Sequence, residues 1–383
     1  MITADVKHPR LLEESEIEAW RAACAAEPAF ANPLLGPDFA QLVGQAREDA
    51  RAAVFRRDGR MAGFIAFHCR GGVAQPIGAA FSDYQALVTV PGERLDGAEA
   101  LGAAGVSGLR LTGLIDPFDA FPSARPSAMQ GFVIEPLPDA DAYYAALREA
   151  NPKRFKNWRR LQNKLEREWG EVVACPTETS PEVLDQLIEW KRDQFRRTGS
   201  HDVLRPEWAR ALFHRILEAR GHARPVMAAL RAGGVLVAGH FGLAVGPHAH
   251  GWLSVINPDS AAAGPGQVLA FRTAEFLPGL GLRSYDLSPG YAHYKAPFAS
   301  RTVEVREGLV TASGRAGAAA RSLNAVWALA GEQRFDAVGR LRRRLDHIAA
   351  AELSAGGRAR GVVEAIAGYG RRAASREPTQ SEA

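Results

Sequence analysis

The sequence is poor in cysteine and has no long apolar run. Its 383 residues include three cysteines, Cys24, Cys69 and Cys175, which lie far apart. They form neither a metal-binding pair nor a disulfide framework, which favours a reducing compartment. No segment approaches the roughly 18 apolar residues that span a bilayer, and the start lacks a signal-peptide pattern. The sequence therefore predicts a cytoplasmic protein without a transmembrane segment, and contact with a membrane surface stays open.

A strong excess of positive charge is also absent. Lysine and arginine number 47 against 43 aspartate and glutamate residues, and the formal net charge is +4. This excess is not gathered into one long stripe, so we expect no DNA binding. His240, His248 and His250 flank one predicted hairpin, but no further ligands accompany them and no metal site is expected. One of these histidines could shuttle a proton or be a hydrogen-bonded core residue.

The chain is long enough for two domains and a tail, and its hydrophobic content of 46% suits globular structure. We predict an α/β fold of two tandem domains, over residues 1–145 and 146–310, with mixed sheets flanked by helices. Residues 311–383 are rich in alanine and arginine and are predicted to form a helical tail, with the last ten residues disordered.

An internal repeat supports two similar halves. The order is a hairpin, a strand, a helix and a strand, and it spans roughly fifty residues from turn to final strand in each half. The predicted elements are a hairpin at 52–69, a strand at 83–90, a helix at 94–104 and a strand at 108–114, and then a hairpin at 226–245, a strand at 251–256, a helix at 267–277 and a strand at 281–287. Chance similarity among hairpins is the alternative.

Helices are predicted between the halves, at 152–169, 181–197 and 206–220. The first has apolar residues every three or four positions on one side and lysine and arginine largely on the other. Such basic side chains commonly extend over an apolar seam with their charged ends in water. Arg159 and Arg160 could instead form an electropositive wall beside a cleft that binds phosphates.

A glycine-rich turn follows the predicted strand at 251–256. Gly264-Pro265-Gly266-Gln267-Val268 leads from a loop into a helix, and this arrangement can bind phosphate through backbone N–H groups and the helix dipole. The segment has neither the lysine of a P-loop nor the spacing of a dinucleotide fold. An ordinary glycine turn is the alternative.

Asp286 lies in a strand of mostly buried type, where a carboxylate commonly has a partner or a purpose. Burial would raise its pKa towards that of a general base, and Lys295 could pair with it or hold an anionic substrate. A nearby tyrosine, Tyr291 or Tyr294, could donate a proton to a leaving group. Asp83 and Tyr84 enter a predicted strand in the first half and could line a cleft between the halves. A purely structural role is open for each of these residues.

Taken together, these motifs resemble the CelD/BcsL-like branch of the GNAT acyltransferases over about residues 30–305. The matching segments are Phe81-Ser82-Asp83-Tyr84, 153–165 with Arg159-Arg160, Lys191 with Gln194 and Arg197, Trp252, Gly264-Pro265-Gly266-Gln267, and Asp286 with Gly290 and Tyr294-Lys295. The resemblance implies tandem GNAT folds similar to the Fem transferases, acetyl-CoA or another acyl-CoA as co-substrate, and a role in cellulose or exopolysaccharide production. The family usually has Ser-Pro-Gly where this chain has Gly264-Pro265-Gly266, which removes one hydroxyl group.

The resemblance implies direct transfer to a small acceptor, such as a sugar or an amine. Asp286 would act as base or orient the acceptor, Tyr294 would protonate the departing thiolate, and Lys295 and Asp83 would position the acceptor. Backbone groups of Leu253, Ser254 and Val255 would stabilise the oxyanion, and Gly264, Gly266, Gln267 and Val268 would hold the pyrophosphate. Tyr84, Arg159, Arg160 and Trp252 would contact substrate. Aminoacyl transfer from charged tRNA and a non-catalytic scaffold role are the alternatives.

Overall fold

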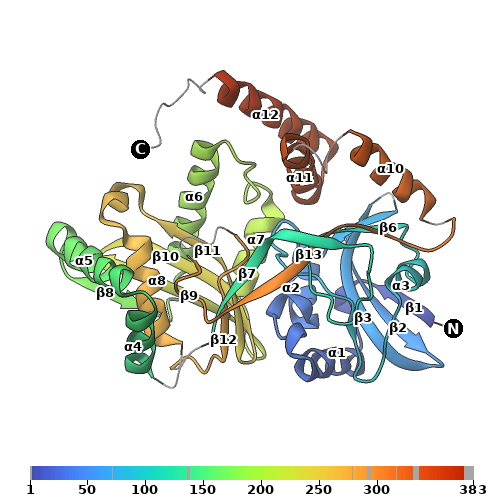
Figure 1. The fold of residues 1–383 in the computed structure, drawn as a ribbon, viewed down its shortest axis with the longest axis horizontal. Helices are drawn as coiled ribbons and strands as arrows, with labels where there is room; N and C mark the ends of the chain where they lie inside the picture. Colours follow the sequence, from blue (N-terminus) through green and yellow to red (C-terminus); the bar gives the residue numbers. More distant parts are fainter. Residues whose placement is uncertain are drawn as a thin grey trace.

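The computed structural model of the chain describes residues 2–70, 72–135, 139–277, 279–290, 295–315, 317–330 and 336–374. Helices flank a single mixed sheet of 13 strands, and the C-terminal helices lie along one side of the molecule (Figure 1). The predicted mixed α/β class is therefore confirmed. The two expected sheets are joined into one.

The strands are β1 (Ile2–Lys7), β2 (Ala50–Arg57), β3 (Arg60–Arg70), β4 (Val73–Pro76), β5 (Val88–Thr89), β6 (Gly108–Leu114), β7 (Arg125–Ile134), β8 (Val172–Cys175), β9 (Ala223–Ala232), β10 (Val235–Val245), β11 (His248–Ile256), β12 (Ser284–Asp286) and β13 (Arg301–Thr311). The α-helices are α1 (Glu14–Ala26), α2 (Pro37–Ala46), α3 (Gly97–Ala103), α4 (Ala140–Ala150), α5 (Pro152–Trp169), α6 (Pro181–Thr198), α7 (Glu207–Glu218), α8 (Pro265–Phe276), α10 (Ala318–Leu329), α11 (Asp336–Ala351) and α12 (Ala355–Ala374).

The order of the strands reveals a near-palindrome. It runs β1-β2-β3-β4-β6-β13-β7-β12-β11-β10-β9-β8. In the first half, β4 pairs in parallel with β6 and α3 lies between them in the chain. In the second half, β11 pairs in parallel with β12 and α8 lies between them. Both halves thus have the order of hairpin, strand, helix and strand, although the strand before the helix in the first half is β4 and not the one predicted at 83–90. This shared topology supports duplication.

The final strand of each half pairs with the other half. Strand β7 follows β6 in the chain but pairs with β12, while β13 follows β12 but pairs with β6. The two exchanged strands also pair with each other, antiparallel, at the centre of the sheet (Figure 1). Each half of the sheet is thus completed by a strand from the other half.

Several predicted elements differ from the structure. The strand expected at 83–90 is reduced to β5, because the chain around Gln85 instead bonds to Gly113 and Ile115 in a loop. The strand expected at 281–287 is only Ser284–Asp286. The strands that were not predicted are β1, β4, β7, β8 and β13. Strand β7 contains Pro126 and Gly131, which weaken a strand signal in sequence.

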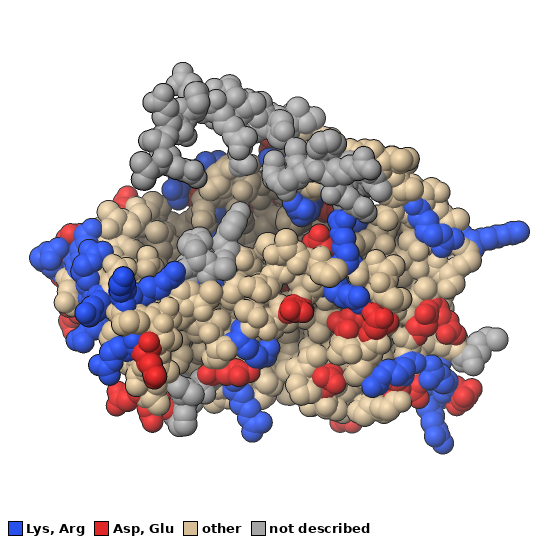
Figure 2. All heavy atoms as spheres, in the orientation of Figure 1, with Lys and Arg blue, Asp and Glu red and all other residues tan. Residues whose placement is uncertain are grey.

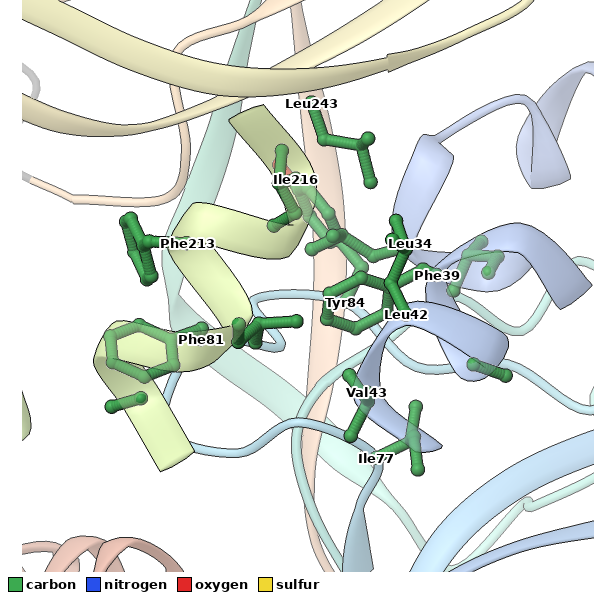
Figure 3. Packing of buried hydrophobic residues seen from close by; sticks show 14 of the residues in the cluster. Leu34, Phe39, Leu42, Val43, Ile77, Phe81, Tyr84, Phe213, Ile216 and Leu243 are labelled. Atoms are coloured by element: carbon green, nitrogen blue, oxygen red, sulfur yellow. The ribbon is translucent and has the colours of Figure 1, made fainter. Parts of the chain in front are cut away.

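One hydrophobic core spans both halves. Helix α2 of the first half packs against α7 of the second, so Phe39 and Leu42 lie in the same cluster as Phe213 and Ile216 (Figure 3). On the opposite face of the sheet, α3 covers first-half strands, and α4, α5 and α8 cover second-half strands. The shared core fixes the two halves against each other.

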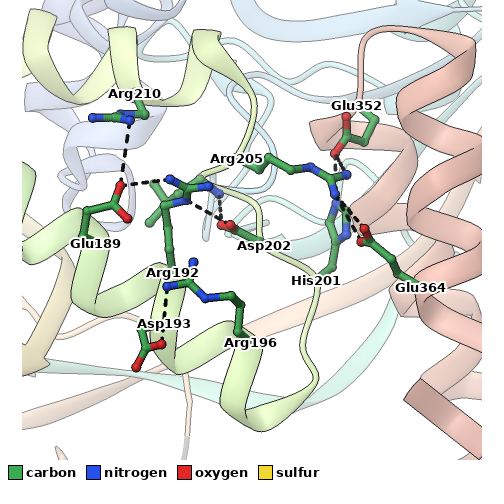
Figure 4. Close-up of polar contacts among 11 residues, drawn as sticks. Glu189, Arg192, Asp193, Arg196, His201, Asp202, Arg205, Arg210, Glu352 and Glu364 are labelled. Atoms are coloured by element: carbon green, nitrogen blue, oxygen red, sulfur yellow. Dashed lines mark hydrogen bonds and ion pairs between the residues drawn. The ribbon is translucent and has the colours of Figure 1, made fainter. Parts of the chain in front are cut away.

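The helical tail is confirmed over the described residues. The last carbonyls of α11 accept hydrogen bonds from both halves, from Arg47 to Ala350 (3.0 Å) and from Trp208 to Ala351 (2.8 Å). Arg205 adds ion pairs to Glu352 and Glu364 beside a second cluster around Arg192 and Asp202 (Figure 4). The predicted disorder of the last ten residues falls almost wholly outside the described residues.

Among the helices described here, none has the length and apolar character needed to cross a bilayer.

Candidate functional site

Strands β11 and β12 separate near the middle of β11. They pair only from His248 to His250, while β11 continues to Ile256. A bulge opens beside this point, because Phe241 of β10 pairs with Leu253 and Gly242 pairs with Gly251. Within the described part of the chain, the β12-facing edge of β11 therefore has no strand partner beyond His250. Bulges and unpaired edges of this kind commonly mark sites where backbone groups meet a ligand.

A small cavity of about 40 Å³ occupies the gap between β11, α8 and β12. We call it the crevice, and its lining includes His240, Ser254, Leu269, Ala270, Thr273, Tyr285, Leu287 and Lys295. Of the residues predicted to form the oxyanion site, Ser254 lines the crevice, whereas the Leu253 and Val255 side chains are buried in the main core.

Two unused polar atoms converge in the crevice. Within the described structure, His240 Nε2 and the Tyr285 hydroxyl are buried and have no hydrogen-bond partner. Both lie beside Gly251, where a Cβ would collide with them. Burial, with help from Lys295 and His250, lowers the pKa of His240 to about 3, so its ring is neutral at physiological pH. These groups are available to a ligand that enters the crevice.

The predicted phosphate-binding turn begins α8. Gly264 adopts the left-handed conformation (φ 69°) that favours glycine, and it caps the helix. The amides of Gln267 and Val268 donate to the Gly264 carbonyl at 3.1 and 3.4 Å, and the Val268 side chain is buried. The first turn carries no acidic residue, so the positive end of the helix dipole is not neutralised there. The next turn of α8 lines the crevice.

A much larger cavity lies across the sheet from the crevice. Its volume is about 630 Å³, and its walls come from the 28–33 segment, β7, β13 and the ends of β11 and β12. Ser284 and Asp286 face this cavity, whereas Tyr285 and Leu287 face the crevice. This alternation follows from the two-residue period of an extended chain. Asp286 therefore faces the large cavity, between two residues of the chain that face the crevice.

Asp286 belongs to a buried polar cluster. Its carboxylate accepts hydrogen bonds from Asn32 Nδ2 (3.3 Å) and the Ser288 amide (2.7 Å), and lies 3.6 Å from His250 Nδ1. On its other side, His250 Nε2 lies 2.9 Å from the Asp83 carboxylate. Burial raises the pKa of Asp286, although His250 opposes the shift. A carboxylate with a raised pKa can accept a proton from an acceptor at neutral pH.

Tyr84 lines the same cavity beside Asp286. Its side chain is 1% exposed, and its hydroxyl interacts with the Asp286 carboxylate. A Cβ at Gly131 would collide with this hydroxyl, so the glycine of β7 makes room for it. Burial, together with the Asp286 and Asp83 carboxylates, raises the pKa of Tyr84, which keeps the phenol protonated. The Tyr84 hydroxyl is thus a donor beside the Asp286 carboxylate in this cavity.

Lys295 lies in the crevice lining rather than in the large cavity. Its ammonium donates to the carbonyls of Ser288 (3.0 Å) and Pro289 (3.1 Å), and burial lowers its pKa. These hydrogen bonds stabilise the turn after β12. The Ser288 amide in this turn donates to the Asp286 carboxylate. Tyr291 and Tyr294, the tyrosines considered as proton donors, lie outside the described residues.

Three predicted substrate residues lie apart from these spaces. The Trp252 indole donates to the Phe81 carbonyl (2.7 Å) and packs against Phe213 in the core between the halves. Arg159 and Arg160 are exposed on α5, where Figure 2 shows a gathering of basic side chains at one end of the molecule. None of the three lines either cavity in the described structure.

Sequence reasoning did not single out His250, Tyr285 or Asn32 as site residues. His250 was one of three candidate histidines, and the hairpin gave no reason to choose it. Asn32 lies 254 positions from Asp286 in the sequence, so only the three-dimensional structure shows that the two side chains are neighbours. Among the described residues, no group of three or more histidine, cysteine, aspartate or glutamate side chains is arranged to hold a metal ion.

Comparison with known proteins gives one family match. Residues 152–296 match the family model described as acetyltransferase (GNAT) domain, a segment that contains β11, α8, β12 and Asp286. No curated protein matches the sequence significantly.

Solved structures give weak similarities. The C-terminal domain of a putative lysylphosphatidylglycerol synthetase from Agrobacterium fabrum has 15% identity and a TM-score of 0.49, over 81% of this chain and 95% of that one. A tandem GNAT protein from the clavulanic acid pathway has 13% identity and a TM-score of 0.47, over 82% and 99%. FemX has 10% identity and a TM-score of 0.49, over 80% and 96%. The family match covers less than half of the chain, and over that segment the sequence is similar to a GNAT acetyltransferase domain.

Proposed function

We propose that the protein is an acyl-CoA-dependent acyltransferase that holds the thioester in the crevice and the acceptor in the large cavity. The main support is the alternation along β12, which directs Asp286 to the cavity and Tyr285 to the crevice. The narrower resemblance to CelD/BcsL-like proteins adds three expectations: acetyl-CoA as donor, a sugar or related small polar acceptor, and a cytoplasmic role in polysaccharide production.

The reaction joins the two spaces through the gap between β11 and β12. An amine or hydroxyl of the acceptor attacks the thioester carbonyl and loses its proton to Asp286, which His250 and Asn32 hold in place. The carbon–sulfur bond breaks as the new bond forms, and the thiolate takes a proton from a tyrosine. Tyr285 has the required free hydroxyl in the crevice, while Tyr294 is the donor that the family resemblance implies.

The start of α8 would bind the phosphates of the donor. A chain that lies along the crevice reaches the first turn of this helix, where the dipole is positive and no carboxylate competes. Because the Gln267 and Val268 amides already bond Gly264, we assign more of this role to the dipole and the Gly266 backbone than to those two amides.

Isothermal titration of the full chain with acetyl-CoA tests the donor. We expect binding by the unmodified protein and loss of at least tenfold in affinity for Gly251→Ala, because the added methyl group collides with His240 and Tyr285 in the crevice. Gly102→Ala is a matched control, since a Cβ there meets nothing within 4 Å. Absence of binding by the unmodified protein, or equal binding by Gly251→Ala, would remove the donor assignment.

A second candidate is aminoacyl transfer from charged tRNA, which the exposed face of α5 favours. From residue 152 to 165 this helix has no acidic residue and carries six cations: Lys153, Arg154, Lys156, Arg159, Arg160 and Lys164. Such a surface suits a phosphate backbone. Binding of bulk tRNA that weakens steeply with salt, and fails in Arg159→Glu/Arg160→Glu, would support it. No RNA binding at low salt would reject it.

A further inference from the structure

The tail holds a disproportionate share of the exposed apolar side chains. Eleven large apolar side chains are exposed in the described structure, and six of them belong to residues 311–383: Leu323, Val326, Leu329, Leu341, Leu353 and Val363. Single exposed apolar residues are ordinary, but a gathering of them in one region marks a surface that meets another protein or a membrane. We therefore considered what the tail contacts.

Helix α10, at the edge of the molecule, packs on the sheet through one side only (Figure 1). Ala320 is buried and lies over Gly108 of β6. Leu323, Val326 and Leu329 follow at intervals of three residues, which places them along one side of the helix. They are 48%, 60% and 87% exposed, so exposure rises with distance from the buried alanine. The C-terminal half of α10 thus presents an apolar face to solvent.

This apolar face does not form part of either space described above. None of the three side chains lines the crevice or the large cavity. A partner peptide commonly docks into a groove, whereas a helix that projects apolar side chains can insert them between lipid headgroups. The outward projection of Leu329, the most exposed of the three, favours a lipid surface.

The charge of the tail also fits a lipid surface. Helices α10, α11 and α12 carry nine arginines against three acidic residues, whereas residues 1–310 carry 35 basic and 36 acidic residues. No acidic residue occurs from 308 to 331, a segment that contains α10. Arg315, just before this helix, is exposed and has no ion-pair partner within the described part of the chain. Cations beside an apolar face are attracted to the phosphates of anionic lipids.

We propose that α10 docks on a membrane surface that contains anionic lipid, with Leu323, Val326 and Leu329 inserted at the level of the headgroups and the tail arginines at the lipid phosphates. The helix would lie in the interface. Because α11 is bonded to both halves through Arg47 and Trp208, docking of the tail would hold the whole molecule at the membrane. The proposal rests on the tail alone and does not depend on the proposed function.

Sedimentation of the full chain with lipid vesicles tests the proposal. One set of vesicles contains phosphatidylglycerol and phosphatidylcholine in equal parts, and the other contains phosphatidylcholine alone. We expect binding to the anionic vesicles at low salt, weaker binding as salt rises, and much weaker binding to the neutral vesicles.

Val326→Ser/Leu329→Ser tests the apolar face without changing the charge. Because both side chains are exposed, the variant should fold, and its affinity for anionic vesicles should fall at least about tenfold. Leu11→Ser/Val235→Ser is the matched control, since these residues are 67% and 47% exposed and lie outside the tail. The control should bind like the unmodified protein.

Arg315→Gln tests the charge. Loss of one cation near the surface should weaken binding to anionic vesicles by about fivefold and leave binding to neutral vesicles unchanged. Equal binding to both kinds of vesicle would overturn the role of anionic lipid.

The remaining outcomes separate the possible occupants of this face. Absence of binding to anionic vesicles at low salt, or undiminished binding by Val326→Ser/Leu329→Ser, would overturn the proposal. A dimer in solution that this variant dissociates, without vesicle binding, would assign the face to a second copy of the chain and also overturn it. Calorimetry with acetyl-CoA on the same variants reports on the proposed function separately, because the changed residues lie outside the crevice.

Discussion

The two strand–helix–strand units of the molecule have the same topology but different surroundings. In the second half, α8 begins with Gly264 and has no acidic residue in its first turn. In the first half, α3 begins with Asp96, whose side chain accepts from the Glu99 amide, and Glu99 adds a second carboxylate. The N-terminus of α3 is therefore neutralised by its own side chains, and only α8 presents an unneutralised positive end.

The space beside the final parallel strand also differs. In the first half, Gln85 fills it: its side-chain oxygen accepts from the amides of Thr112 and Gly113 (3.0 Å each), and its nitrogen donates to the Ser82 carbonyl (2.7 Å). Gly113 corresponds to Asp286 when the two Gly-Leu-Arg strands are aligned, and a Cβ at Gly113 would collide with the Asp83 backbone. The unit in the first half thus has a structural role, while the unit in the second half retains space and unpaired polar groups.

Replacing Asp286 by Asn should have the largest effect. If this carboxylate accepts the acceptor proton, turnover should fall by about 10²–10⁴-fold with little change in acetyl-CoA affinity. Steady-state release of free CoA measures the loss. Thr112→Val, at the position in the first half that corresponds to Tyr285, should leave turnover unchanged. Equal activity in Asp286→Asn would show that the two units do not differ in the way we propose.

Removing the Gln85 side chain should damage stability and spare the site. Gln85→Ala leaves the buried Gly113 amide, the part-buried Thr112 amide and the Ser82 carbonyl without this partner, which should lower the free energy of unfolding by about 2–4 kcal/mol. Urea unfolding measures the change. The exposed Gln45→Ala should stay within about 0.5 kcal/mol of the unmodified protein. A Gln85→Ala variant of full stability would mean that the first unit is not held closed by this residue.

The pH dependence should follow Asp286. Because burial raises its pKa above the ordinary 3.8, the ionised base is lost as pH falls through that raised value. Below it, kcat/KM should drop about tenfold per pH unit, and the acidic limb should lie at higher pH than for an exposed aspartate. The residual activity of Asp286→Asn should lack this limb. A limb that persists in the variant would assign it to another group.

A carboxylate placed at the start of α8 should neutralise the positive end of this helix, as the carboxylates of α3 do in the first half. Gln267 is exposed, so Gln267→Glu should fold and weaken acetyl-CoA binding about twofold to fivefold through repulsion at the helix end. Calorimetry at low salt gives the clearest reading. Glu99→Gln, the reverse change in α3, should leave affinity unaltered. No difference between the two variants would argue against phosphate binding at α8.

Local sequence patterns accounted for much of the fold. Asp58-Gly59 and Gly233-Gly234 located the hairpins, and the apolar stripe of 152–169 located α5 with its exact bounds. The exchange of β7 and β13 was not predictable, because it depends on pairing between residues more than 150 positions apart, such as Val133 and Arg301.

The site was predictable only in part. Asp286 stood out because a carboxylate in a buried strand needs a partner, and Asp83 because it enters a predicted strand that could line a cleft. The structure brings both carboxylates to His250. Tyr285 looked like an ordinary strand residue, and Asn32 like a turn former. Their roles depend on which face of the sheet each side chain lies on and on which loop covers that face. Local sequence patterns predict neither property.

The exchanged strands carry a consequence for dissection of the protein. A cut between residues 145 and 146 leaves β7 on one fragment, although its partners β12 and β13 belong to the other. Either fragment alone would display unpaired strand edges and a broken core, and would tend to aggregate. Two co-expressed fragments, in contrast, have complementary edges that could rejoin. The molecule is thus suited to a split reporter, whose signal would depend on both pieces meeting.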